Sequence, residues 1–126
     1  MILNQTDERP IFIQLSDVLK DSIISGAYKE GEQIPSITEF SIELKINPAT
    51  ALKGVNILVE EGLLYKKRGL GMFVEKGSRQ KLIGERKNKF ADDFIVPAMR
   101  EAKRLGIEKS EVLSIIERGG FDGDRD

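Results

Sequence analysis

The 126-residue sequence predicts a mainly α-helical fold with one small β-hairpin. Three observations lead to this fold class. Apolar residues recur at helical spacing over most of the chain, cap residues mark where these periodic segments begin or end, and a glycine-containing turn separates two short apolar runs near the middle. Because 40% of the residues are apolar, a chain of this length can bury one modest core.

The first two predicted helices are marked by their caps. The first follows Pro10, which suits a first helical turn, and it ends at Gly26. One side of this helix carries Ile11, Phe12, Leu15, Val18, Leu19 and Ile23. The second helix starts after Ser36, because Ser36 and Glu39 have the spacing of a capping box, and it extends to Leu44.

The third predicted helix has signals at both ends. Asn47 is a good N-cap, Pro48 suits the first helical position, and Gly62 can close the helix in a left-handed conformation. The residues expected to face inward are Ala51, Val55, Leu58 and Val59. The outward face of this helix carries Ala49, Lys53, Asn56 and Glu60. Its side chains are small and polar in the first turns, so the helix could approach another surface closely.

A hairpin follows the third helix. Residues 63–65 resume an extended pattern, residues 68–71 (RGLG) supply a turn, and residues 72–74 form the returning strand. Three helices followed by a hairpin describe a winged helix, in which the second and third helices form a helix-turn-helix. The later of these two helices enters the DNA major groove by its N-terminal end, and the hairpin is the wing.

Charge is concentrated near this hairpin although the formal net charge is only −1. Between Lys66 and Lys89 there are nine lysines and arginines and only two acidic residues, which leaves a local excess of seven positive charges. A basic patch beside a glycine turn favours contact with phosphates. An ordinary solvated face, or a tight hairpin without any ligand, remains an alternative at this point.

Several function classes are disfavoured. Without cysteine or histidine, the chain has no zinc-thiolate site and lacks the commonest general base, so no metal or cofactor is expected. The pairs at 60–61 and 92–93 are adjacent on helices and diverge, which argues against an enzyme. The GxG of residues 69–71 lacks the further residues of a dinucleotide or P-loop motif. The sequence has no signal-peptide pattern and no apolar run of about 20 residues, so a cytoplasmic location without membrane contact is expected.

The residues also resemble a known family. The motif residues are Pro10-Ile11-Phe12, Gln14-Leu15, Ile24 with Gly26, Gly31, IPS at 34–36, Thr50, Leu58, EEGLL at 60–64 and GLGMFV at 69–74. In order and spacing they resemble the N-terminal DNA-binding domain of the GntR family of bacterial transcription regulators, over residues 10–74. The pair Asn47-Pro48 with Thr50 is similar to the YtrA subfamily, whose members carry only a short helical C-terminal segment.

The resemblance implies a set of DNA-contacting residues. They are Ser36, Thr38, Asn47, Pro48, Ala49, Thr50, Leu52, Lys53 and the wing residues Gly69, Leu70 and Gly71. This sequence departs from its relatives at Thr38, where arginine is usual, at Pro48, where arginine is frequent outside this subfamily, and at Leu52, where arginine or glutamine is common. Each missing guanidinium removes a guanine or a phosphate contact, so most phosphate neutralisation would come from Lys53, Lys66, Lys67 and Arg68.

The C-terminal part is expected to be a helical dimerisation segment over residues 79–119, after a winged-helix domain over 1–78 and before a disordered tail over 120–126. Pro97 predicts either a kinked helix or two helical pieces meeting near Val96, and Gly106 ends this stretch. The expected dimer-interface residues are Phe90, Phe94, Ile95, Ala98, Ala102, Leu105, Val112 and Ile116. Resemblance to the YtrA group implies a homodimer; the alternative is that these helices fold back onto the first helix of their own chain.

The sequence therefore predicts a homodimeric regulator, a repressor by resemblance, that binds a palindromic operator in double-stranded DNA. A winged-helix module with weakened DNA binding, acting in protein contacts or nonspecific DNA association, is the alternative. Whether a small-molecule effector exists is left open.

Overall fold

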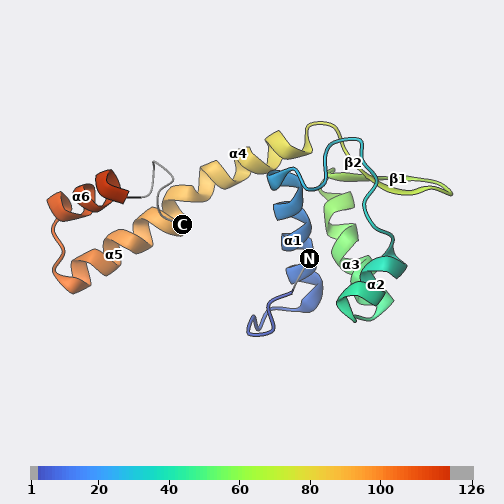
Figure 1. The fold of residues 1–126 in the computed structure, drawn as a ribbon, viewed down its shortest axis with the longest axis horizontal. Coiled ribbons are helices and arrows are strands. Elements are labelled where there is room, and N and C mark those ends of the chain that lie inside the picture. Colours follow the sequence, from blue (N-terminus) through green and yellow to red (C-terminus); the bar gives the residue numbers. More distant parts are fainter. Residues whose placement is uncertain (1–2, 120–126) are drawn as a thin grey trace. The chain divides into compact units, whose positions relative to one another are not determined.

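The computed structural model describes residues 3–119, and its contacts divide the chain into two units, 1–84 and 85–126. The first unit contains, in order, α1 (Ile11–Ser25), α2 (Ile37–Leu44), α3 (Pro48–Glu60), β1 (Leu64–Lys67) and β2 (Gly71–Val74) (Figure 1). Helix α4 (Ser78–Phe90) begins in the first unit and ends in the second. The π-helix η1 (Ala91–Ile95) and the helices α5 (Val96–Leu105) and α6 (Lys109–Gly119) follow. The predicted mainly helical fold with one hairpin is confirmed.

Local capping explains where the helices of the first unit begin and end. The Ser36 hydroxyl accepts a hydrogen bond from the Glu39 N–H at 3.0 Å, and the Glu39 carboxylate accepts one from the Ser36 N–H at 3.1 Å. Asn47 caps α3 by accepting the Ala49 N–H at 2.8 Å. Gly26 closes α1 with φ +85°, a left-handed conformation that suits glycine. All of these contacts are local, which is why the sequence predicted them.

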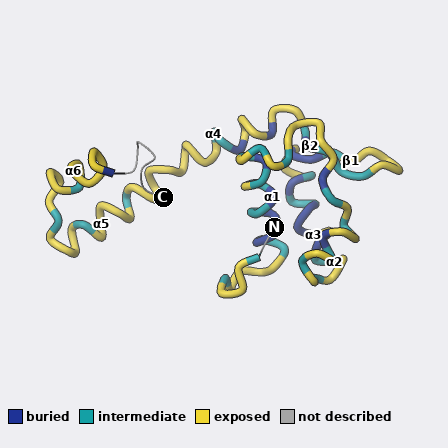
Figure 2. The backbone as a smooth tube through the Cα atoms, in the orientation of Figure 1, coloured by how far each residue is buried: buried dark blue, intermediate teal, exposed yellow. Residues whose placement is uncertain are grey.

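The core of the first unit lies where α1 and α2 pack against α3 and the base of the hairpin (Figure 2). Its buried apolar residues are Leu15, Leu19, Ile23, Ile34, Phe40, Ala51, Val55, Leu58, Leu63, Leu64, Val74 and Leu82. Ile11, expected on the inward side of α1, is exposed instead. Gly54 is buried on α3, and a Cβ there would lie 2.9 Å from the Phe12 carbonyl oxygen of α1. Glycine therefore permits the close approach of α1 and α3.

The sheet is a two-stranded antiparallel hairpin in which Leu64 pairs with Val74 and Lys67 with Gly71. Gly71 thus belongs to the strand rather than to the turn in which it was predicted, and residues 68–70 form the loop. The connector between α1 and α2, residues 26–36, adds a short bridge to the free edge of β2, where Gln33 pairs with Phe73. This bridge fastens a segment some forty residues away to the returning strand.

The first turns of α4 belong to the first unit. The buried Ser78 hydroxyl donates to the Leu63 carbonyl at 2.8 Å, and Leu82 joins the core. Arg79 Nε donates to the Ile24 carbonyl at 2.9 Å, and Lys81 Nζ donates to the Glu61 carbonyl. These two cations satisfy carbonyls at the C-terminal ends of α1 and α3, where positive charge is favoured. The contacts divide the chain after Gly84, six residues beyond the expected boundary at 78.

The second unit changes helix type immediately before Pro97. The Val96 N–H bonds to the Ala91 carbonyl five residues back, which makes η1 a π-helix. Proline lacks an N–H and its ring clashes with the carbonyl four residues earlier, so a wider turn at this place accommodates it. The backbone stays right-handed helical at Phe90, Ile95 and Val96, so α4, η1 and α5 follow one another without a break, which matches the expected single distorted helix rather than two pieces. Gly106 ends α5 with φ +74°, as the sequence predicted.

The described part of the second unit, residues 85–119, buries only Gly119. Its large apolar side chains are exposed instead, and Phe94 and Leu105 are each 66% exposed. The predicted tail, 120–126, lies outside the described residues. Among residues 3–119, no helix has both the length and the apolar character needed to cross a bilayer.

Candidate nucleic-acid interface

The outward face of α3 carries most of the predicted DNA-contacting residues of this helix. Pro48, Ala49, Leu52 and Lys53 are exposed, and Thr50 is half-buried. The residues from Ile46 to Leu52 include no charged side chain. The N-terminal half of α3 therefore offers water a small, mostly apolar surface.

Two predicted contact residues are also caps. Asn47 Oδ1 is occupied by the Ala49 N–H, and Ser36 Oγ by the Glu39 N–H. Bidentate recognition of adenine needs both the oxygen and the nitrogen of an asparagine amide. Asn47 can therefore donate from its amide nitrogen to a phosphate or base, while the cap uses one of the two lone pairs of its oxygen and restricts how the amide can pair with adenine. Thr38, in the first turn of α2, is exposed.

Lys53 has a partner that sequence reasoning missed. Its ammonium lies 4.0 Å from the centroid of the Phe12 ring on α1, at cation–π distance. The side chain is thus held at the boundary between α1 and α3. A phosphate contact by Lys53 has to form from this position or replace the aromatic contact.

The wing places its cations on both faces of the hairpin. Directly paired residues of an antiparallel ladder share a face, so Lys66 lies on the face of Met72 and Tyr65 on the face of Phe73. The Tyr65 and Phe73 rings stack with centroids 5.7 Å apart, and the Lys67 ammonium lies 4.9 Å from the Phe73 centroid. Lys66 is thus directed toward the face that carries the core, and Lys67 toward the opposite face.

The tip of the wing is held by a side chain from the connector. Gln33 Nε2 donates to the Leu70 carbonyl at 2.5 Å. A Cβ at Gly71 would lie 2.6 Å from that same nitrogen, and Gly71 has φ +128°. Gly69 has φ +79°, and Leu70 is 64% exposed. The sequence contains no local signal for Gln33, because the contact spans 37 residues.

The basic run between Lys66 and Lys89 is not one patch. Lys66, Lys67 and Arg68 are exposed on the wing, whereas Arg79 and Lys81 are engaged with backbone carbonyls at the ends of α1 and α3. The expected local excess of seven charges is therefore divided between the wing, the anchor of α4 and later residues. Only the three wing cations lie on the hairpin.

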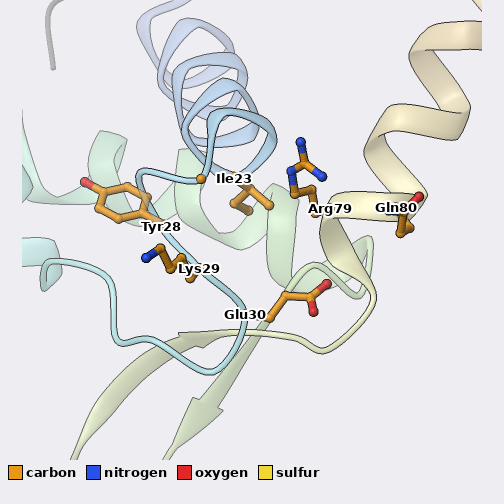
Figure 3. Close-up of a pocket in the computed structure, with 7 residues that line it drawn as sticks. Ile23, Tyr28, Lys29, Glu30, Arg79 and Gln80 are labelled. Atoms are coloured by element: carbon orange, nitrogen blue, oxygen red, sulfur yellow. The ribbon is translucent and has the colours of Figure 1, made fainter.

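A hollow of about 410 Å³ lies between the end of α1, the connector and the start of α4 (Figure 3). Its lining includes Ile23, Tyr28, Lys29, Glu30, Arg79 and Gln80. Glu30 accepts the Gly77 N–H at 2.8 Å, so this carboxylate and Arg79 both serve to anchor α4. Burial, with a smaller contribution from Glu43, raises the pKa of Tyr28. The charged side chains Glu30 and Arg79 in this lining therefore hold backbone groups.

No cluster of three or more acidic side chains in residues 3–119 is arranged to hold a metal ion. The pairs Glu60-Glu61 and Asp92-Asp93 belong to the end of α3 and to η1. Glu61 forms a 2.8 Å ion pair with Lys20 of α1, which gives it a structural partner.

A family model described as bacterial regulatory proteins, gntR family, matches residues 14–74, which run from α1 to the end of the wing. Residues 14–74 of this chain are a DNA-binding domain of the GntR family. This GntR chain is 26% identical over 105 residues to the HTH-type transcriptional regulator YhcF of Bacillus subtilis strain 168, covering 83% of the chain and 85% of YhcF. It is 26% identical over 99 residues to the transcriptional repressor YtrA of the same organism, covering 79% of the chain and 75% of YtrA.

A solved structure of the AraR DNA-binding domain in complex with operator ORE1 also matches. The identity is 28% and the TM-score 0.52, over 57% of this chain and 88% of that one. The predicted likeness to YtrA is confirmed by the match to that repressor. The GntR family and these relatives regulate transcription and are not enzymes.

Proposed function

We propose that this GntR chain binds a palindromic operator as a homodimer, with α3 in the major groove and the wing at the minor groove. The observation that carries the proposal is the exposed, uncharged N-terminal half of α3 in the same unit as a wing that carries three cations. Small residues at the start of α3 leave room for a base edge, and the glycines of the wing leave room for a sugar-phosphate backbone. The AraR domain, a similar protein, is in complex with an operator.

Phosphate contacts would come from the wing and from Lys53. Lys66 and Lys67 are on opposite faces of the hairpin, so they can contact phosphates on the two sides of a groove that the wing enters. Arg68 is exposed beside the loop and adds a third cation. The remaining contact residues of this proposal are Ser36, Thr38, Asn47, Pro48, Ala49, Thr50, Leu52, Gly69, Leu70 and Gly71.

Dimerisation would use the exposed apolar side chains of the second unit. The proposed interface residues are the exposed Phe90, Phe94, Ile95, Ala98, Leu105 and Ile116 and the half-buried Ala102 and Val112, and the exposed Met99, Leu113 and Ile115 add to this surface. A helical segment whose apolar face has no internal core is stabilised by burying that face against a copy of itself. Two identical DNA-binding units related by a twofold axis match a palindromic site.

The relatives support a proposal for the regulatory sign and the location. YtrA is a repressor, and we propose repression here as well. A regulator that binds bacterial chromosomal DNA works in the cytoplasm.

The alternative is a winged-helix module that associates with proteins or with DNA of any sequence. It is favoured by Thr38, Pro48 and Leu52, because none of them can supply the bidentate guanine contact of an arginine. The two functions differ in sequence selectivity, which is measurable directly.

The test is fluorescence anisotropy with the full chain and a labelled duplex from the DNA upstream of its own gene, beside a scrambled duplex, at several salt concentrations. We expect tighter binding to the native duplex. The variant Lys66→Ala/Lys67→Ala should weaken binding to both duplexes and reduce the salt slope by up to about 0.9 for each phosphate that is no longer neutralised. The control Lys103→Ala, which removes a cation on α5, should leave the slope unchanged.

Equal affinity for both duplexes would reject operator recognition in favour of the alternative. Thr38→Arg adds a second criterion: a sequence-reading protein should change its selectivity strongly, whereas a protein-contact module should not.

A further inference from the structure

The described residues of the first unit expose four large apolar side chains. They are Ile11, Ile42, Leu52 and Leu70. Three of these four belong to α2, α3 and the wing loop, and only Ile11 does not. Leu52 is 44% exposed and is not among the residues packed against the core. These side chains are therefore available to a partner at the proposed DNA surface.

Leu52 shares the outward face of α3 with Ala49. The two residues are three positions apart in the first two turns, so their side chains are neighbours on the helix surface. Lys53 follows Leu52, but its ammonium lies over the Phe12 ring. The apolar surface formed by Ala49 and Leu52 is therefore the principal feature of this part of the helix.

Polar readers of base edges are scarce around this surface. The Asn47 oxygen is used by the helix cap, and no arginine, glutamine or charged residue occurs between Ile46 and Leu52. The guanine and adenine contacts that need a guanidinium or a free amide are thus closed to the first two turns of α3. Apart from the Asn47 cap, the half-buried Thr50 and Lys53, what this helix offers to the major groove is a pair of methyl-bearing side chains.

In the major groove, the apolar group by which bases differ is the C5-methyl of thymine, and apolar side chains contact it. We propose that α3 reads thymine methyl groups through Ala49 and Leu52, so that each operator half-site presents thymines to the first two turns of this helix. This inference rests on the proposed function, because it requires α3 to lie in the major groove.

Deoxyuridine provides the test, since it has the same hydrogen-bonding groups as thymidine and lacks only the methyl. The full chain is titrated onto its operator, and onto operators in which each thymine of both half-sites is replaced in turn by deoxyuridine. At one or two positions of each half-site, affinity should fall about fourfold per methyl removed, as expected for exposing one CH₂-sized group. In Leu52→Ala, the replacement should have no further effect at the position that Leu52 contacts.

The control variant is Ile11→Ala, which removes another exposed apolar side chain, from α1 outside the DNA-binding elements, and should keep the sensitivity to deoxyuridine. Thermal unfolding of each variant verifies that the winged-helix unit is intact. If the wild-type chain selects its operator but binds every deoxyuridine duplex equally well, the inference is wrong and the proposed function stands. If Leu52→Ala retains the full deoxyuridine effect, the assignment to Leu52 is wrong. If no duplex is bound selectively, the proposed function and the inference fail together.

Discussion

Gln33 is a residue whose importance is visible only in the folded chain. Its side-chain amide donates to the Leu70 carbonyl at the wing tip, and its backbone pairs with Phe73. Gly71 leaves the space that this amide occupies. Gln33 thus ties the segment before α2 to the exposed end of the hairpin. We interpret this residue as a positioning residue for the wing.

The variant Gln33→Met keeps the length of the side chain and removes the donor. A single hydrogen bond contributes about 0.5–1.5 kcal/mol, so the free energy of unfolding should fall by no more than this. The freed wing tip should exchange its amide hydrogens faster at residues 69–71, and DNA affinity should fall several-fold because ordering the wing then opposes binding. Hydrogen exchange and anisotropy measure the two effects.

Gln80→Met on α4 is the matched control for Gln33→Met, because it makes the same chemical change at an exposed site outside the wing. It should leave exchange at the wing tip and DNA affinity unchanged. Exchange at residues 69–71 that is the same in Gln33→Met and wild type would contradict the positioning role.

At the scale of elements, the packing of α1 against α3 depends on Gly54. A methyl group there would lie 2.9 Å from both the Phe12 carbonyl oxygen and a methyl carbon of Leu15. The backbone carbonyl cannot rotate away as a side chain could. Because Phe12 also contacts Lys53, this close approach sets the surroundings of a proposed DNA-contacting lysine.

Gly54→Ala should therefore destabilise the first unit by about 1–3 kcal/mol, although alanine is the better helix former. Gly84→Ala on α4 is the control, because nothing lies within 4 Å of a Cβ built there. It should be neutral or stabilising by up to about 1 kcal/mol. Chemical denaturation of both variants measures whether the free energy of unfolding falls or rises relative to the wild type. A stabilising Gly54→Ala would mean that α1 and α3 are not in such close contact.

At the scale of the whole molecule, the two units differ in how they use their apolar residues. The first unit buries twelve of them in one core. In the second, Phe90 and Phe94 lie side by side with ring centroids 5.9 Å apart, and both rings are more than half exposed. A segment built in this way gains little stability by itself, which is the physical basis of the proposed homodimer.

Phe94→Asp should convert the dimer to a monomer, because a carboxylate would be buried without a partner at the proposed interface. Sedimentation equilibrium measures the change, and affinity for a full palindrome should fall toward that for a half-site. Arg100→Asp, an exposed position in the same segment, is the control and should remain dimeric. A wild-type chain that is monomeric at all concentrations would reject the homodimer.

The sequence by itself determined the elements of the winged helix. Caps such as Ser36 with Glu39, and Asn47 before Pro48, act over three or four residues, so their physics can be read along the chain. Helical periodicity likewise placed Ala49 and Lys53 on the outward face of α3, where both are exposed, whereas Leu52 was placed there by the resemblance. The resemblance carried by residues 10–74 added the DNA-binding function.

Only the tertiary structure decided which of these residues are engaged. Gln33 at the wing tip, Gly54 against Phe12, Lys53 over the Phe12 ring, and Arg79 on the Ile24 carbonyl are contacts between segments roughly forty or more residues apart. No local propensity encodes such pairs, because they arise when the core brings distant backbone together. For that reason the basic run looked like one patch in the sequence, whereas folding uses part of it to anchor α4 and leaves three of its cations on the wing.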